Sequence, residues 1–447
     1  MNNLTTFNLK RDFWLVTFSF LAIFQPPFVP IALIYIMGLV TAMLLFFSSS
    51  RKLEYKVYRE CHIEWMYRLF ILMSLYIFIV GFINWSFIEK RDILKTWMKS
   101  INQTSVLSFI EFAMVWYILI KSYQRKFGLN DIVTILCWVG ILQSICCIAA
   151  FISPQIRSIF MMFGDRNLYS NEFFMERRGY GFSTNLLDTF GYGMGLIGGY
   201  MILVKWTKSK LLRIISLCLV LFAISVNART GFVVIFLAVI VKLFISYKGL
   251  NRIIILSIAV AVGFSLYSII PQLLESGKRS DNITISWISS SFEDIYLLFS
   301  TDKSQNLSFE DVSFIDNIID LPDNAFELLF GTGHYVYDTE SSLGFRTDIG
   351  YFNLLWEFGI IGTIAVMSCM LYFMGLPFFK TKNRIIRSIV VFNIIAYLIV
   401  EVKAILIGYS PGVMVNYIMT FSLYYYLYCK PSNNNSQMSC KQWSYQL

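Results

Sequence analysis

The sequence is short of charge and of the residues that interrupt or cross-link soluble domains. Charged residues make up 15% of the 447 residues and hydrophobic residues 57%, with nine prolines and two histidines. Soluble domains are about one-quarter charged and about half apolar, so this composition excludes a soluble globular protein. Apolar runs of about 17 to 25 residues recur along the chain instead, which is the length that a helix needs to cross a bilayer.

Motifs for several common chemistries are also missing. There is no Walker A segment for ATP, no HExxH and no Cys/His ligand spacing for a metal, and no Gly-x-Ser-x-Gly elbow. The eight cysteines fall in apolar runs or in segments expected to be cytoplasmic, so no disulfide framework is predicted. We expect no metal ion and no cofactor. The net charge of +9 needs no nucleic-acid partner, because it follows the membrane topology.

The apolar runs predict an all-α, polytopic membrane protein with about 12 transmembrane helices, since a helix satisfies its own backbone hydrogen bonds in lipid. The expected spans cover residues 12–29, 31–48, 67–87, 105–122, 131–152, 186–204, 211–226, 231–247, 253–271, 351–377, 388–408 and 412–428. The first two are separate spans because residues 12–49 would make a single helix about 57 Å long. Pro26, Pro27 and Pro30 then lie in the turn between them.

Lysine and arginine collect in the connections that share one side of the membrane when both chain ends are cytoplasmic, as the positive-inside rule requires. The external side receives one loop before the sixth helix and a long, acid-rich loop before the tenth. The chain then divides into residues 1–271 with nine helices and external loop 153–185, residues 272–350 as an external cap, residues 351–429 with the last three helices, and residues 430–447 as a cytoplasmic tail.

Arginines stand at three places on the external side. Arg229 lies in a tight Asn-Ala-Arg-Thr-Gly turn between two helices, and its planar guanidinium suits two-point binding of a phosphate. Contact with a lipid headgroup is the alternative. Arg177 and Arg178 precede a flexible Gly-Tyr-Gly segment that could wrap around an anion, although adjacent arginines are also common in solvated loops. Arg346 ends the long acidic loop.

A second group of candidates flanks the start of the tenth helix. His334 follows a Gly-Thr-Gly segment, and an imidazole can accept a proton near neutral pH. Asp348 is either a catalytic carboxylate or the N-cap of this helix. Glu357 lies about 9 Å beyond Tyr351 along the helix, where a carboxylate is either functional or a hydrogen-bond partner for a neighbouring helix. The other histidine, His62, is expected in a solvated cytoplasmic loop.

The sequence resembles the bacterial O-antigen polymerase (Wzy) family, within the larger group that also contains the O-antigen ligases. The layout of two sizeable external loops carries the resemblance over most of the chain, and short patches carry it as sequence. The patches are Asn227-Ala-Arg229-Thr-Gly231, Phe330-Gly331-Thr-Gly333-His334, and Thr347-Asp348-Ile-Gly350-Tyr351 followed by Trp356-Glu-Phe-Gly359-Ile-Ile-Gly362.

The resemblance implies a GT-C-like, metal-independent glycosyltransferase of the bacterial inner membrane, whose active site faces the periplasm. Its donor would be a glycan on undecaprenyl pyrophosphate, and its acceptor would be a lipid-linked repeat unit in the same lipid bilayer. A chain-length regulator and a flippase of the same pathway would be its protein partners. The long loop over residues 272–350 would form a periplasmic cap.

The resemblance also suggests roles for individual residues. Arg229 matches the family's Arg-Thr/Ser-Gly position, and arginines would stabilise the leaving pyrophosphate in the absence of a metal. His334 stands where related ligases place a catalytic histidine that activates the acceptor hydroxyl. The spacing from Arg178 to Gly191 departs from an arginine–glycine motif of some polymerases. The further candidates are Arg178, Arg177 and Arg346 for pyrophosphate, and Asp348 and Glu357 for the base.

These inferences favour an O-antigen repeat-unit polymerase. An O-antigen ligase, which transfers the finished glycan to lipid A-core, is the enzyme alternative. A flippase or another secondary transporter is the alternative outside the enzymes. Transporters usually show two similar halves and polar helices at the midplane, whereas this sequence shows neither an internal repeat nor a row of buried charges.

Overall fold

The structure is a computed structural model of the whole chain. It describes residues 7–25, 32–47, 51–87, 98–162, 181–183, 188–228, 230–246, 322, 324–333, 350–402 and 410–429. Every regular element in these ranges is helical, which confirms the all-α prediction for them. Most of the expected cap over residues 272–350 lies outside the described residues.

The helices follow the apolar runs. They are α1 (Leu9–Phe24), α2 (Ala32–Phe46), α3 (Arg51–Glu60), α4 (Ile63–Phe87), the π-helix η1 (Asn102–Val106), α6 (Leu107–Gln124), α7 (Leu129–Ile152), α8 (Pro154–Met162), α11 (Asp188–Leu203), α12 (Lys210–Asn227), α13 (Thr230–Ser246), α17 (Ala325–Phe330), α18 (Gly350–Lys380), α19 (Arg384–Glu401), α20 (Pro411–Tyr424) and the π-helix η2 (Tyr425–Cys429). Each predicted span overlaps at least one of these helices in the described residues, except 253–271, which lies outside them.

Four of the described helices are long and apolar enough to cross a membrane. They cover Ile63–Asn84, Leu129–Ile152, Lys210–Asn227 and Gly350–Lys380, and the bent pair of α2 and α3 makes a fifth if it is one span. The apolar side chains that these helices expose, such as Leu72 and Ile364, suit contact with lipid. The protein is therefore membrane-embedded, and the larger number of about 12 spans stays a prediction.

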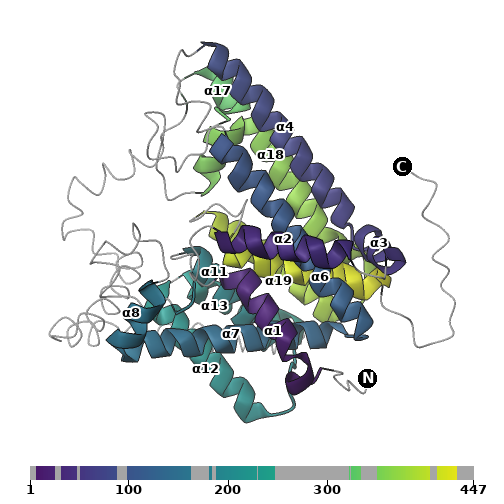
Figure 1. Cartoon of the computed structure of the whole chain (residues 1–447), viewed down its shortest axis with the longest axis vertical. Coiled ribbons are helices and arrows are strands. Elements are labelled where there is room, and N and C mark those ends of the chain that lie inside the picture. The colour runs from purple at the N-terminus through teal and green to yellow at the C-terminus, as the bar shows by residue number, and fades with distance from the viewer. Residues whose placement is uncertain are drawn as a thin grey trace.

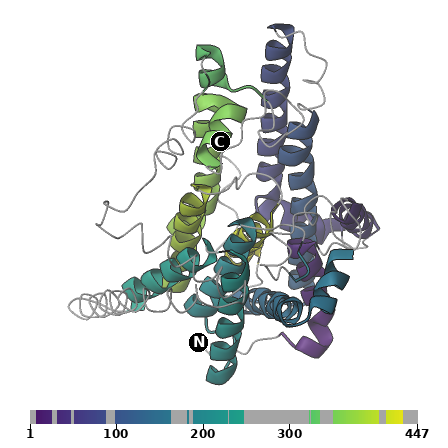
Figure 2. The same ribbon diagram turned by 90° about the vertical axis from the view of Figure 1, so that its left-hand side faces the viewer.

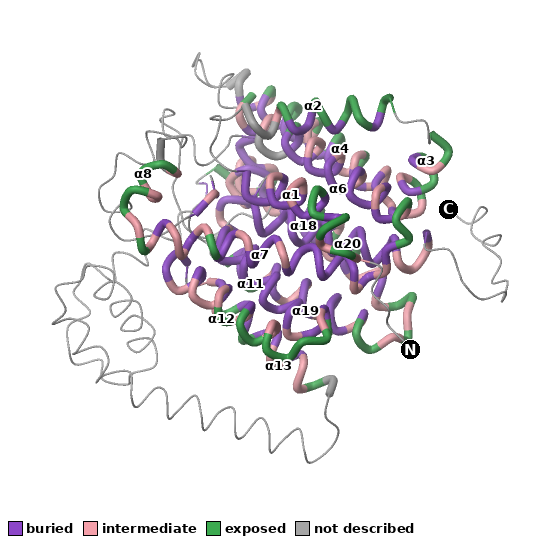
Figure 3. Tube along the Cα trace, turned by 60° about the horizontal axis from the view of Figure 1, so that its bottom comes forward, coloured by how far each residue is buried: buried purple, intermediate pink, exposed green. Residues whose placement is uncertain are grey.

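The core of the molecule forms around α11 and α20. All residues of α20 are buried, and α11 packs against it through glycine, because a Cβ on Gly193 would lie 3.1 Å from the backbone of Pro411 and Gly412. Small residues at such contacts are typical of helix pairs in membranes. Burial is densest on α7, α11 and α20, whereas α2 exposes one side (Figure 3). α4 and α18 both extend from this core toward α17 at one end of the molecule (Figures 1 and 2).

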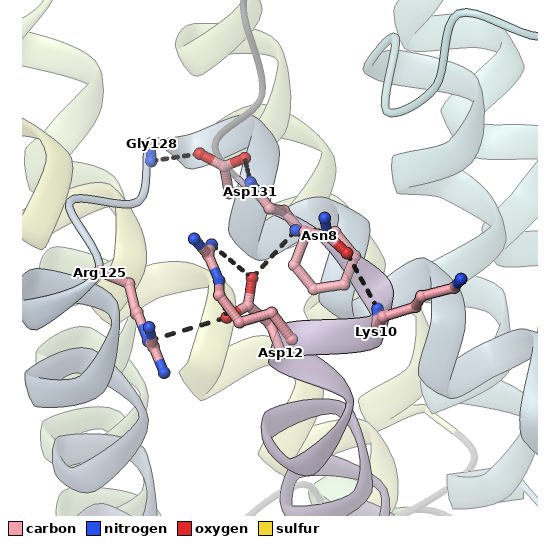
Figure 4. Close-up of polar contacts among 8 residues, drawn as sticks. Asn8, Lys10, Asp12, Arg125, Gly128 and Asp131 are labelled. Atoms are coloured by element: carbon pink, nitrogen blue, oxygen red, sulfur yellow. Dashed lines mark hydrogen bonds and ion pairs between the residues drawn. The ribbon is translucent and has the colours of Figure 1, made fainter.

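Polar contacts tie together the start of α1, the end of α6 and the start of α7 (Figure 4). The buried carboxylate of Asp12 accepts hydrogen bonds from Arg11 at 2.8 and 2.9 Å and lies 3.8 Å from Arg125. Asp131 accepts a hydrogen bond from the Gly128 N–H at 2.7 Å, which satisfies a free backbone donor at the start of α7. Two of the basic segments predicted to be cytoplasmic, those of Arg11 and Arg125, therefore meet at one end of the helices.

The predicted span over residues 351–377 is confirmed as α18, which contains a break at Gly359 with φ 66° that the sequence did not predict. One prediction about local structure is wrong. His62 was expected to be solvated, but it is half-buried in the turn between α3 and α4, with ring centroids 4.9 Å from Tyr424 and 6.0 Å from Tyr428. Burial lowers the pKa of His62.

Candidate functional site

The structure describes one of the seven predicted site residues and the chain neighbours of several others. Glu357 is described, whereas His334, Asp348, Arg177, Arg178, Arg229 and Arg346 lie outside the described residues. The segment that leads into His334, the residues on both sides of Arg229, and residues 181–183 after Arg178 are described. Glu357 and these flanking segments are the parts of the predicted site that the structure describes.

The segment before His334 docks against the break in α18. The N–H and the hydroxyl of Thr332 both donate to the carbonyl of Trp356, at 2.7 and 2.9 Å. The N–H of Gly333 donates to the carbonyl of Glu357 at 3.1 Å. Thr332 and Gly333 therefore donate hydrogen bonds to carbonyls beside the break, where a helix loses its regular backbone donors.

Glycine is required at this contact because the two backbones touch. Gly331 and Gly333 have φ of 82° and 70°, which favours glycine. A Cβ on Gly331 would lie 2.5 Å from both the Glu357 carbonyl oxygen and the Gly359 nitrogen, and a Cβ on Gly359 would overlap the Gly331 nitrogen. Residues 331–333 can therefore pack against the break in α18 only because Gly331 and Gly359, where the two backbones touch, have no side chains.

α4 supplies two further polar anchors that the sequence analysis did not single out. The Tyr76 hydroxyl lies 2.8 Å from the carbonyl oxygen of Phe330 and 2.9 Å from that of Phe358. The Asn84 amide donates to the carbonyls of Gly331 and Thr332, at 3.2 and 3.0 Å. The signal for Asn84 was present in the sequence, because an asparagine within an apolar span is costly unless it is hydrogen-bonded.

The carboxyl group of Glu357 is buried beside this junction. Its side chain is 1% exposed, and the Ser100 hydroxyl, just before η1, donates a hydrogen bond to it. Such a bond fits the structural alternative for Glu357, a contact with a neighbouring helix. The Glu357 backbone carbonyl, not its carboxylate, contacts the chain that continues into His334, so the geometry leaves both roles open for the carboxyl group.

The predicted arginine turn is tight and is packed against α11. α12 ends at Asn227 and α13 begins at Thr230, so two residues connect the helices. A Cβ on Gly231 would lie 2.8 Å from the carbonyl oxygen of Gly191, and a Cβ on Gly191 would overlap the Thr230 hydroxyl. The absence of a side chain at Gly231 therefore permits the turn to approach α11 closely.

The flanks of two arginine segments meet at Cys147 on α7. The Asn227 amide, at one side of the Arg229 turn, lies 3.5 Å from the Cys147 sulfur. Gly181, which follows the Arg177–Arg178 pair by three residues, has φ 58°, and a Cβ there would lie 2.9 Å from the Cys147 nitrogen. Residues that are about 46 positions apart in the chain therefore converge on one helix, as a shared anion site would require.

A further carboxyl group, outside the set of predicted site residues, is buried on α6. Glu111 on α6 is fully buried, and its carboxyl group lies beside the backbone of Ser410, the residue before α20. The hydroxyl of Tyr417 on α20 is also buried, and it has no hydrogen-bond partner in the described chain. Glu111 differs from Glu357 in that no described polar segment leads from it to a predicted catalytic residue.

Comparisons with protein-family models, curated proteins and solved structures give no match for this chain.

Proposed function

We propose that this protein is an O-antigen repeat-unit polymerase of the bacterial inner membrane. It would transfer the growing glycan from undecaprenyl pyrophosphate to an incoming lipid-linked repeat unit on the periplasmic side. The observation that carries the proposal is the convergence at Cys147 of the segments that flank Arg178 and Arg229. Two arginine-bearing segments that share one helix suit a diphosphate, which has two anionic groups to bind.

In this reaction the bond between the donor sugar and pyrophosphate breaks, and an acceptor hydroxyl forms the new glycosidic bond. Arg229 and Arg178, with Arg177 and Arg346 as further candidates, would stabilise the charge that develops on the leaving undecaprenyl pyrophosphate. The acceptor proton passes to a base. His334 is the first candidate for it, and the docked Gly-Thr-Gly segment supports this because it ends directly before His334.

Asp348 and Glu357 are the other candidates for the base. Glu357 has a defined hydrogen-bond donor in Ser100, so it would act on His334 or on substrate from a fixed position. The partners of the protein would be lipid-linked oligosaccharides, a chain-length regulator and a flippase of the same pathway, all in or at the inner membrane.

Lipopolysaccharide from a deletion strain tests the proposal on a gel. Loss of a polymerase leaves lipid A-core carrying a single repeat unit, whereas loss of a ligase leaves core alone. Complementation with the wild-type gene should restore the ladder of long chains. Core alone in the deletion strain would replace the proposal by the ligase alternative, and an unchanged ladder would contradict both.

A further inference from the structure

The Tyr76 hydroxyl on α4 contacts both of the segments that meet at the break in α18, the end of α17 and α18 itself. It lies 2.8 Å from the Phe330 carbonyl oxygen, four residues before His334. It lies 2.9 Å from the Phe358 carbonyl oxygen, the residue after Glu357. A hydroxyl has one proton, which is shared between the two acceptors, so a single group links the backbone that leads to His334 with the backbone that carries Glu357.

Asn84 extends the same contact two helical turns further along α4. Its amide donates to the carbonyls of Gly331 and Thr332. Residues 76 and 84 lie on one face of a helix, since eight residues span about 2.2 turns. Between them, a Cβ on Gly333 would lie 2.9 Å from the nitrogen of Gly81 and 3.1 Å from the carbonyl oxygen of Ile77. Residues 330–333 therefore pack along one continuous face of α4.

We propose that Tyr76 and Asn84 are positioning residues, which hold the chain before His334 at a fixed place relative to Glu357. The catalytic consequence rests on the proposed function, whereas the contacts between α4 and residues 330–333 are present in the structure independently of the reaction. Small displacements of reacting groups cost about 10²-fold in rate. Neither residue needs to touch substrate, so they act through the backbone of residues 330–333 and through the break in α18.

Tyr76→Phe tests this with little change in volume, because the ring stacks on Phe358 with centroids 6.4 Å apart and remains in place. Tyr67→Phe is the matched control. Tyr67 is on the same helix and donates to the carbonyl of Phe109 at 3.1 Å, away from the junction. Asn84→Leu, which removes the amide donor, is the second test variant.

The first measurement is independent of activity. Hydrogen–deuterium exchange of the protein in nanodiscs follows the amides of Thr332 and Gly333, which donate to α18. We expect exchange about 5-fold to 10-fold faster in Tyr76→Phe, the factor that corresponds to loss of one ordinary hydrogen bond, and no change in Tyr67→Phe. Equal exchange in Tyr76→Phe and wild type would overturn the proposal.

The second measurement is turnover with lipid-linked repeat unit in the same nanodiscs. We expect kcat to fall about 10-fold to 100-fold in Tyr76→Phe with KM unchanged, and melting temperature to stay near that of Tyr67→Phe. A purely structural role would instead lower the melting temperature and leave the kcat of the folded fraction unchanged, which also overturns the proposal. An inactive wild-type enzyme would refute the proposed function, and the exchange measurement would then decide the positioning role alone.

Discussion

The chain before His334 and the turn around Arg229 are held in place by different physical means. Residues 331–333 are fixed by hydrogen bonds to main-chain carbonyls of α18 and by donors from α4. The Arg229 turn combines the close packing of Gly231 and Gly191 against neighbouring atoms with the contact between the Asn227 amide and the Cys147 sulfur. Directional bonds set orientation, whereas packing sets proximity, so the first arrangement suits a proton-transfer group and the second suits an anion-binding group.

The two regions also differ in what surrounds each glycine. At Gly331 and Gly359 the nearest atoms belong to backbone, which cannot move aside without breaking hydrogen bonds. At Gly191 the nearest atom is the side-chain hydroxyl of Thr230. We therefore expect substitution of Gly331 or Gly359 to be irreparable and substitution of Gly191 to be partly repairable by a second mutation. Gly231, whose Cβ would meet the Gly191 carbonyl oxygen, belongs with the first pair in this respect.

The largest effect is expected from Gly359→Ala. The positive φ and the overlap of a Cβ with the Gly331 nitrogen should prevent the break from forming, so that folded protein fails to accumulate. Fluorescence-detected size-exclusion chromatography of a tagged protein measures this. The matched control is Gly375→Ala on the same helix, where the nearest atom is 3.6 Å away. Equal yields of folded protein from the two variants would show that the packing of residues 331–333 against α18 does not depend on the break at Gly359.

His334→Gln should come next, with turnover reduced about 10²-fold to 10⁴-fold, because an amide can donate and accept hydrogen bonds but cannot take up the acceptor proton. Donor binding should change little, since the proposed function assigns pyrophosphate binding to the arginines. The assay is product length against time for purified enzyme in nanodiscs. His62→Gln is the control, as His62 lies in the turn between α3 and α4. Activity of the His334→Gln enzyme would show that His334 is not the base, and Asp348 and Glu357 would be the remaining candidates.

Arg229→Ala should lower turnover about 10²-fold to 10³-fold, the cost of removing one charge-assisted donor from a developing anion. Arg229→Lys should restore activity only in part, since lysine keeps the charge and loses the planar fork. Gel ladders and donor affinity are measured at matched protein levels. A normal ladder from Arg229→Ala would favour contact with a lipid headgroup, and the two regions would then no longer differ in function.

The smallest effect is expected from Gly191→Ala, which should destabilise the protein by about 1–3 kcal/mol through overpacking. Adding Thr230→Ala removes the nearest atom and should recover part of the loss, although the Ala228 Cβ at 2.8 Å remains. Thermal unfolding of the two single variants and the double variant gives the coupling energy. If the changes in unfolding free energy of the two single variants add up to that of the double variant, the contact between Gly191 and Thr230 does not contribute to the stability of the turn.

The sequence by itself determined the class of the protein. Low charge and recurrent apolar runs require helices in lipid, and the described helices follow those runs. It also located the tight turn between α12 and α13, since an Asn-Ala-Arg-Thr-Gly stretch between two apolar runs leaves little room for a loop. The Gly-Thr-Gly segment was recognisable as unusual, because two glycines around one residue indicate a backbone that a side chain would obstruct.

Only the tertiary structure decided what those glycines contact. Gly359 looks like any glycine in an apolar helix, and nothing local to it predicts a break, because its positive φ is stabilised by residues 331–333, more than twenty positions earlier. The same holds for Tyr76 and Asn84, whose partners lie about 250 residues away, and for the meeting of Gly181 and Asn227 at Cys147. Hydrophobic periodicity fixes which segments become helices, whereas the pairing of distant backbone groups depends on how those helices pack, and no single segment encodes it.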